Sequence, residues 1–186
     1  MQYLTADESR AWAVRRGYPV NASNGRLSES EVRDPIRFDV PEDAGARVIL
    51  ARTLWESAGQ GASEVLVWVT DWGVWPSGEH PPLAEAARRG FGAERPMHET
   101  PGHLARSGDD DAALGVLCMA VLFLWDCWVL PADGRPAVFV SHDELGVVDP
   151  RDDDRGLRQR LEALGFVRDR ATSHPGGEGS SPDAQP

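Results

Sequence analysis

The dipeptide Asp133-Gly134, with an apolar run on each side, constrains the fold more than any other feature of this sequence. Asp-Gly is typical of the tight turn of a β-hairpin, and "WDCWVLPADGRPAVFVSHDE" has room for two strands around it. Strands joined by such a turn run antiparallel, so the sheet cannot be wholly parallel. The sequence predicts a single α+β domain, whose mixed or mostly antiparallel sheet is packed by helices.

Helices are expected over five segments. The first begins with a capping signal, because Thr5 is followed three residues later by Glu8, and Gly17 ends it. In the second, Pro41 is placed in the first turn. The five expected segments are 5–17, 41–59, 82–90, 109–123 and 149–166.

Strands are expected at 36–40, at 63–69 and in the hairpin. The run "SEVLVWV" at 63–69 is almost continuously apolar, which is typical of a strand covered on both faces. Residues 18–35 and 90–108 show no periodicity and are expected to be irregular. The domain is expected to span 1–168 and to end with the hairpin and a helix. The Gly-, Ser- and Pro-rich residues 169–186 are expected to form a disordered tail.

The longest apolar run, residues 112–125, contains 14 residues, whereas a membrane span needs about 20. It is therefore expected to be a buried helix that runs into a strand. The N-terminal segment lacks the basic and apolar regions of a signal peptide. Cys118 and Cys127 lie in apolar runs with no metal-binding spacing, which predicts buried reduced thiols. Together these features predict a cytoplasmic protein without a membrane segment.

The net charge of −11 is unevenly distributed. Residues 1–93 carry 10 Arg and 13 acidic residues, whereas residues 94–186 carry 9 Arg and 17 acidic residues. A negative field repels phosphate backbones, which argues against nucleic acid as a partner. The charge fits a basic protein partner, and it fits equally a chain whose charge only maintains solubility.

The stretch "VLVWVTDWGVWPSGEHPPL" places several costly side chains just after the expected strand at 63–69. Trp68 lies within that strand and is expected in the core, with the chain leaving the sheet from residue 71. Loops on a rigid scaffold are a usual place for binding residues. Here the loop either closes the core or presents at least one exposed Trp to a partner. The candidates are Asp71, Trp72, Trp75, Glu79 and His80.

Further polar candidates lie downstream. Asp126 interrupts a long apolar stretch, so its carboxylate is expected to accept hydrogen bonds from buried donors. The segment "SHDE" contributes His142, Asp143 and Glu144, and an exposed polar turn is its simplest interpretation. His98 and His103 are five residues apart with Pro-Gly between them, which predicts a loop rather than a helical pair of metal ligands. The sequence contains no HExxH, GxSxG, P-loop or dinucleotide fingerprint.

The set "WVTDWGVWPSGEH", "PGH", "FLWDCWVL" and "VSHDE" is similar to a group of uncharacterised bacterial proteins of this size. In its small size, acidity, Trp content and lack of catalytic motifs, the chain also resembles the immunity proteins of bacterial polymorphic toxins. That resemblance is one of general character and covers no defined motif. It implies a partner protein and assigns no catalytic residue.

The sequence thus predicts a non-enzymatic bacterial binding protein, of the immunity type, that docks a basic protein partner. No cofactor and no metal are assigned. The expected binding residues are Asp71, Trp72, Trp75, Glu79, His80, Asp126, His142, Asp143 and Glu144. The alternative is a small hydrolase or metal-dependent enzyme. It would use some of Asp71, Glu79, His80, His98, His103, His142 and Asp143. Convergence of three or more of these side chains in space would favour the enzyme.

Overall fold

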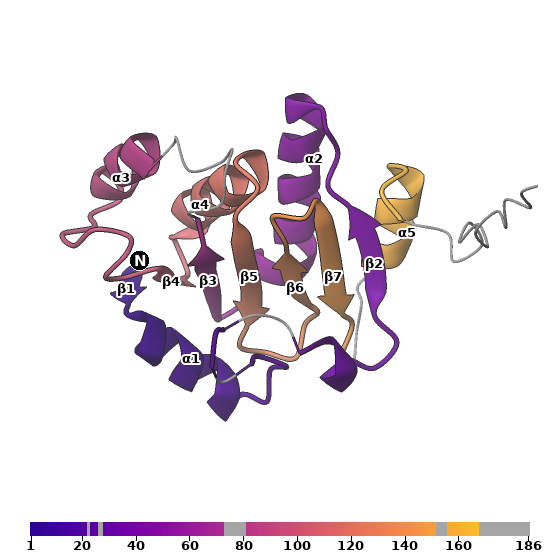
Figure 1. Cartoon of the computed structure of the whole chain (residues 1–186), viewed down its shortest axis with the longest axis horizontal. Helices are drawn as coiled ribbons and strands as arrows, with labels where there is room; N and C mark the ends of the chain where they lie inside the picture. Colours follow the sequence, from indigo (N-terminus) through magenta and orange to yellow (C-terminus); the bar gives the residue numbers. More distant parts are fainter. Residues whose placement is uncertain (22, 26–27, 73–80, 152–155, 168–186) are drawn as a thin grey trace, which may run out of the picture.

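The hairpin around Asp133-Gly134 provides the central strands of the sheet. The computed structural model describes residues 1–21, 23–25, 28–72, 81–151 and 156–167. Within these ranges the chain forms a seven-stranded antiparallel sheet in the order β1-β4-β3-β5-β6-β7-β2 (Figure 1). The strands are β1 (Gln2–Leu4), β2 (Ile36–Asp39), β3 (Glu64–Asp71), β4 (Gly102–Arg106), β5 (Asp126–Pro131), β6 (Ala137–Val140) and β7 (Leu145–Asp149). The predicted α+β class is confirmed, with β5 and β6 as the predicted hairpin.

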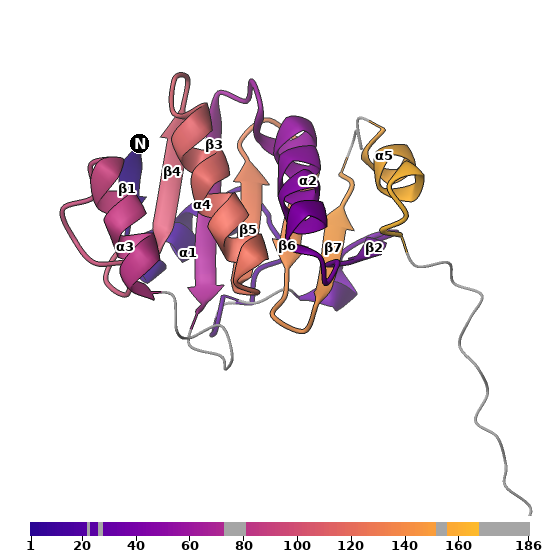
Figure 2. The same ribbon diagram turned by 90° about the horizontal axis from the view of Figure 1, so that it is seen from above.

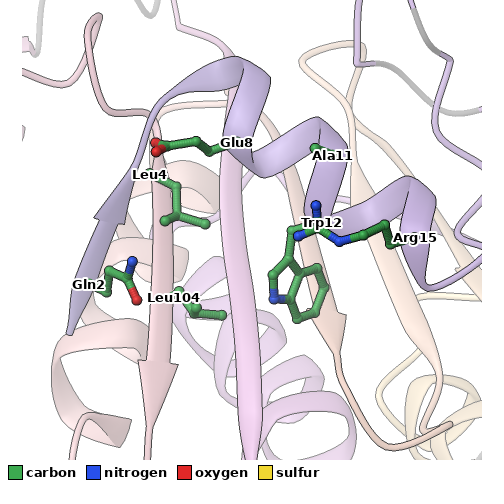
Figure 3. A pocket seen from close by; sticks show the side chains of 7 residues that line it. All are labelled: Gln2, Leu4, Glu8, Ala11, Trp12, Arg15 and Leu104. Carbon is green, nitrogen blue, oxygen red and sulfur yellow. The ribbon is translucent and has the colours of Figure 1, made fainter.

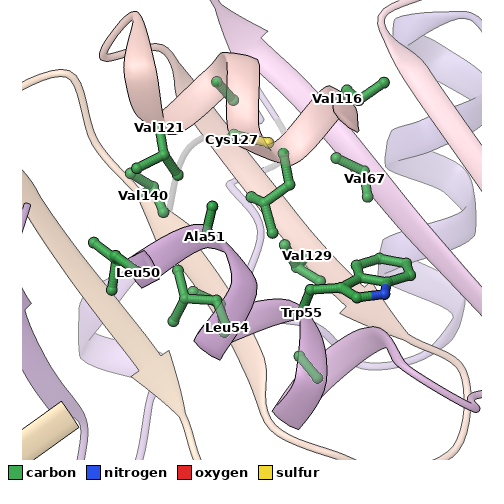
Figure 4. Packing of buried hydrophobic residues seen from close by; sticks show 14 of the residues in the cluster. Leu50, Ala51, Leu54, Trp55, Val67, Val116, Val121, Cys127, Val129 and Val140 are labelled. Carbon is green, nitrogen blue, oxygen red and sulfur yellow. The ribbon is translucent and has the colours of Figure 1, made fainter. Parts of the chain in front are cut away.

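Helices cover both faces of the sheet, but unequally (Figure 2). They are α1 (Ala6–Arg15), α2 (Ala44–Leu54), α3 (Pro81–Gly90), α4 (Asp110–Leu122) and α5 (Leu157–Ala163). Apolar residues of α2, α4 and α5 form the larger core with one face of the sheet. Figure 4 shows Leu54 and Trp55 of this core facing Val67 and Val129 of the central strands. Segment 12–20 covers the other face, where Trp12 and Tyr18 pack with Trp68 and Trp128.

The helix ends follow the capping signals, except that α2 begins later than predicted and α5, predicted over 149–166, begins only at Leu157, since Asp149 belongs to β7. Thr5 caps α1 and forms the reciprocal capping box with Glu8, as the sequence predicts. Helix α2 begins only at Ala44, because the Asp43 carboxylate accepts from the Ala46 N–H and caps the helix there. Pro41, predicted in the first turn, therefore lies before the helix. A π-helical turn, Trp55–Gly59, follows α2.

Three strands were not expected. Residues 90–108 were predicted to be irregular, but Gly102–Arg106 form β4, which pairs with both β1 and β3. Strands β1 and β7 were missing from the prediction; they are three and five residues long. Short strands with few alternations leave little periodicity to detect. The predicted tail at 169–186 and most of the predicted binding loop, residues 73–80, lie outside the described residues.

As expected, the apolar run at 112–125 forms most of α4 and then leads into β5. No helix among the described residues has the length and apolar character needed to cross a membrane.

Candidate functional site

A register shift in the sheet brings two aspartates face to face. Strands β3 and β5 pair regularly up to Val69 opposite Cys127, and the next pair is Asp71 opposite Asp126. Thr70 is thus one extra residue on β3, and extra residues of this kind redirect the side chains that follow them. Strand β3 therefore reaches Asp71, which was predicted to have left the sheet. Like charges directly opposite one another are destabilising unless other groups offset them.

The Asp126 carboxylate is buried, as the sequence predicts, and only 1% of the side chain is exposed. Its Oδ1 accepts a hydrogen bond from the backbone N–H of His142, at 2.8 Å. The same oxygen lies 2.7 Å from His142 Nδ1. A carboxylate can only accept, so Nδ1 carries the hydrogen in this arrangement. Asp126 thereby fixes both the backbone and the ring of His142.

His142 lies in the turn 141–144, which joins β6 to β7. The turn is polar, as predicted, with Asp143 and Glu144 exposed and His142 half-buried. The second ring nitrogen of His142, Nε2, lies 3.5 Å from Asp143 Oδ1. The imidazole therefore faces a carboxylate at each nitrogen, with the buried Asp126 on one side and the exposed Asp143 on the other.

Asp71, Asp126 and His142 converge at one end of the sheet. Each offers one ligand atom, and these atoms all lie within 4.8 Å of one another. The end of β3, the beginning of β5 and the end of β6 meet there because the three strands are antiparallel neighbours (Figure 1). Two carboxylate oxygens and one imidazole nitrogen at this spacing are able to coordinate a divalent cation.

Among the described residues, the other predicted candidates are not part of this cluster. Trp72 follows Asp71 and is half-buried, with its ring packed against the larger core. Trp75, Glu79 and His80 fall outside the described residues. His98 is exposed, with 3.9 Å between its Nε2 and Glu99 Oε1.

His103 was expected on a loop but belongs to β4 and is fully buried. Its Nε2 accepts a hydrogen bond from Arg88 Nε at 2.9 Å, and its Nδ1 lies 3.2 Å from the Val67 carbonyl oxygen. Burial, and then the Arg88 charge, lower the pKa of His103 to about 3. His103 is therefore a neutral core residue that joins α3 to the sheet.

Cys127, which follows Asp126, is excluded as a nucleophile. Burial, followed by the neighbouring Asp126 charge, raises the pKa of its thiol. The thiol therefore stays protonated at neutral pH, and only the thiolate is an effective nucleophile or metal ligand.

Two residues near the cluster were not predicted. Thr70 provides the register shift, and its Oγ1 lies 3.4 Å from the Asp126 carbonyl oxygen. Arg47 on α2 contacts the segments that lead to Asp126 and to His142. Neither residue belongs to a motif, because both roles arise only from the tertiary arrangement.

A separate pocket of about 260 Å³ lies between β1, α1 and β4 (Figure 3). Leu4, Trp12 and Leu104 line its apolar part, with Gln2, Glu8, Ala11 and Arg15 around them. None of the cluster residues lines it. The Glu8 carboxylate is already engaged by the N–H and hydroxyl of Thr5.

Comparisons with protein families, with curated proteins and with solved structures found no match to this chain. Function is therefore inferred from the geometry of the cluster.

Proposed function

We propose that this protein is a metal-dependent enzyme whose divalent cation is held by Asp71, Asp126 and His142. The observation that carries the proposal is the spacing of their ligand atoms, all within 4.8 Å of one another. The ends of β3 and β5 and the turn after β6 supply these residues, so the sheet and its connecting turn preset the spacing.

Electrostatics favours a cation at this position. Asp71 and Asp126 face each other in the sheet, and a divalent ion between them would attract both carboxylates. Hard carboxylate oxygens combined with an imidazole nitrogen suit Mn²⁺, Fe²⁺ or Zn²⁺ better than Ca²⁺, which prefers oxygen ligands alone.

The number of protein ligands supports catalysis over a purely structural role. Structural zinc sites have four protein ligands, whereas catalytic sites have three and leave a position for water. Asp71 and His142 are half-buried, so water can reach this end of the sheet. The cation would lower the pKa of bound water and supply a nucleophile for hydrolysis. With the hydrogen on Nδ1, Asp126 Oδ1 would orient the ring of His142, and Nε2 would keep the lone pair that binds the cation.

The test is hydrolysis by the metal-free protein after addition of Mn²⁺, Zn²⁺ or Mg²⁺. Chromogenic phosphodiester, phosphomonoester and carboxylic ester substrates cover the main hydrolytic classes. We expect metal-dependent turnover of at least one class and its loss in Asp126→Asn. Asp111→Asn is the matched control, because it removes one exposed carboxylate at the opposite end of α4. Turnover that is equal in the wild type and Asp126→Asn would contradict the proposal.

Docking of a basic protein partner, as an immunity-type binding protein, is the second candidate function. It is favoured by the exposed Asp143 and Glu144, which lie beside the cluster, and by the half-buried Trp72. Trp is common at binding hot spots, and acidic groups steer basic partners. The test is coelution with basic proteins encoded beside its gene. We expect the double variant Asp143→Lys, Glu144→Lys to abolish coelution and Asp111→Lys to preserve it. The reverse pattern would exclude this surface as the docking site.

Both candidate functions are proposed for the cytoplasm. Cys118 and Cys127 are free thiols, which supports a reducing compartment.

A further inference from the structure

One guanidinium joins three segments of the chain next to the cluster. Arg47 Nε donates to the Pro41 carbonyl oxygen at 2.6 Å, and Nη1 donates to the Leu122 carbonyl oxygen at 3.0 Å. Nη2 lies 3.5 Å from Glu144 Oε1. Only 14% of the Arg47 side chain is exposed, whereas half of the Glu144 side chain is exposed, so the two bonds to carbonyl oxygens are better shielded from water than the ion pair.

Two of the three segments lead directly to the cluster. Leu122 ends α4, four residues before Asp126, and Glu144 follows His142 by two residues. Arg47 therefore contacts one segment on the Asp126 side of the cluster and one on the His142 side.

Both segments contain a strained backbone. Leu124 has a φ of 54° and Glu144 a φ of 61°, in the left-handed region that favours glycine. Leu124 lies just after the end of α4, where the Trp125 N–H donates to the Ala120 carbonyl oxygen. Strained residues persist where surrounding contacts hold them, and Arg47 provides such a contact to each segment.

We propose that Arg47 is a positioning residue, which sets the distance between the Asp126 carboxylate and the His142 ring. The role in metal binding rests on the proposed function, whereas the effect on the bond between Asp126 Oδ1 and His142 Nδ1 does not. Arg47 donates only, so it cannot itself be a ligand of a cation.

The positive charge of Arg47 makes the direction of the change in cation affinity informative. If Arg47 acted only through its positive charge, its removal would tighten the binding of a cation nearby. If Arg47 positions the ligands, its removal weakens binding, because the ligand atoms lose their preset spacing. The two accounts therefore predict opposite changes in affinity.

The experiment compares Arg47→Met and Arg47→Lys with the wild type. Arg52→Met is the matched control, since Arg52 lies on the same helix but is exposed and paired with Glu56. The first measurement, on metal-free protein, is the exchange rate of the His142 Nδ1 proton by NMR. The second is the dissociation constant for Mn²⁺.

We expect Arg47→Met to speed exchange of the His142 Nδ1 proton by about tenfold or more, and to weaken Mn²⁺ binding by about tenfold. Arg47→Lys should lie between, because a single ammonium cannot reproduce the planar fork of donors. Arg52→Met should match the wild type. Unchanged exchange, or tighter Mn²⁺ binding in Arg47→Met, would overturn the proposal.

The two measurements separate failure of this proposal from failure of the proposed function. If the wild type binds no Mn²⁺, the metal centre fails, and the exchange rate alone decides whether Arg47 positions His142. If the wild type binds Mn²⁺ and both rates and affinities are unchanged in Arg47→Met, only the positioning role fails. Should Arg47→Met not fold, Arg47→Lys decides by the same measurements.

Discussion

Arg88 donates a hydrogen bond from its Nε to His103 Nε2 across 2.9 Å, and both side chains are fully buried. The other nitrogens of Arg88 reach the carbonyl oxygen and hydroxyl of Thr100 and the carboxylate of Glu85. The network joins α3 to β4 and requires a neutral imidazole, because His103 must accept from a cation.

Stability should therefore fall in acid through His103. Its pKa is about 3 in the folded chain and ordinarily 6.5, so the unfolded chain binds a proton that the folded chain excludes. The contribution is complete above pH 6.5 and is lost as the pH falls toward 3. The expected loss is about 1.4 kcal/mol per pH unit within that window.

Urea unfolding from pH 7 to pH 4.5 measures this loss. His103→Gln keeps an acceptor for Arg88 but cannot titrate, so its stability should depend less on pH than that of the wild type. His98→Gln, at an exposed position, is the control and should follow the wild type. Equal pH slopes for the wild type and His103→Gln would refute this role for His103.

Asp126→Leu should lower the free energy of unfolding by about 2 kcal/mol or more. The substitution leaves the backbone N–H of His142 without its buried acceptor. Asp126→Asn should cost less, because an amide oxygen still accepts. The denaturant midpoint of each variant provides the comparison, and a midpoint of Asp126→Leu equal to the wild type would show that these bonds do not stabilise the fold.

Trp68→Ala should cost about 3–5 kcal/mol, the usual range for emptying a large buried aromatic site. Trp68 is 2% exposed and packs in the core beneath α1, where Gly25 approaches its ring closely. Trp72→Ala should cost less, since Trp72 is half-buried. Calorimetric or denaturant unfolding of both variants tests the order, and an equal cost would contradict it.

Glu144→Gly should raise the free energy of unfolding by up to about 1 kcal/mol, because glycine adopts a φ of 61° without strain. The lost contact with Arg47 subtracts little, since half of the Glu144 side chain is exposed. Asp143→Gly is the control: its φ is not positive, so glycine there should not stabilise. Chemical denaturation of the two variants tests the contrast, and a destabilised Glu144→Gly would show that the side-chain contact outweighs the strain.

Much of the fold could be predicted because local signals and packing agree. The Asp133-Gly134 turn, the Thr5 capping box and the apolar run of β3 each specify one element without reference to distant residues. Strand β4 was not predicted, because no local signal specifies it. Its five residues include Gly102 and the buried polar His103, so its place in the sheet depends on partners in β1 and β3.

The candidate site could be predicted only in part. Asp126 and His142 were both candidates, since a buried carboxylate needs donors and a polar turn followed β6. Their pairing with Asp71 depends on the register shift at Thr70, which no local pattern reveals. The contacts of Arg47 likewise join segments 75 residues apart in sequence, beyond the reach of any spacing rule.

The proposed metal centre is tested by titrating the metal-free protein with Mn²⁺ and measuring the free ion by electron paramagnetic resonance. We expect one bound Mn²⁺ per chain in the wild type and in Asp111→Asn. We expect loss of that stoichiometric binding in Asp126→Asn and in His142→Gln, each of which removes one ligand. A wild type that binds no Mn²⁺, or an Asp126→Asn variant that binds it as tightly as the wild type, would contradict the metal centre.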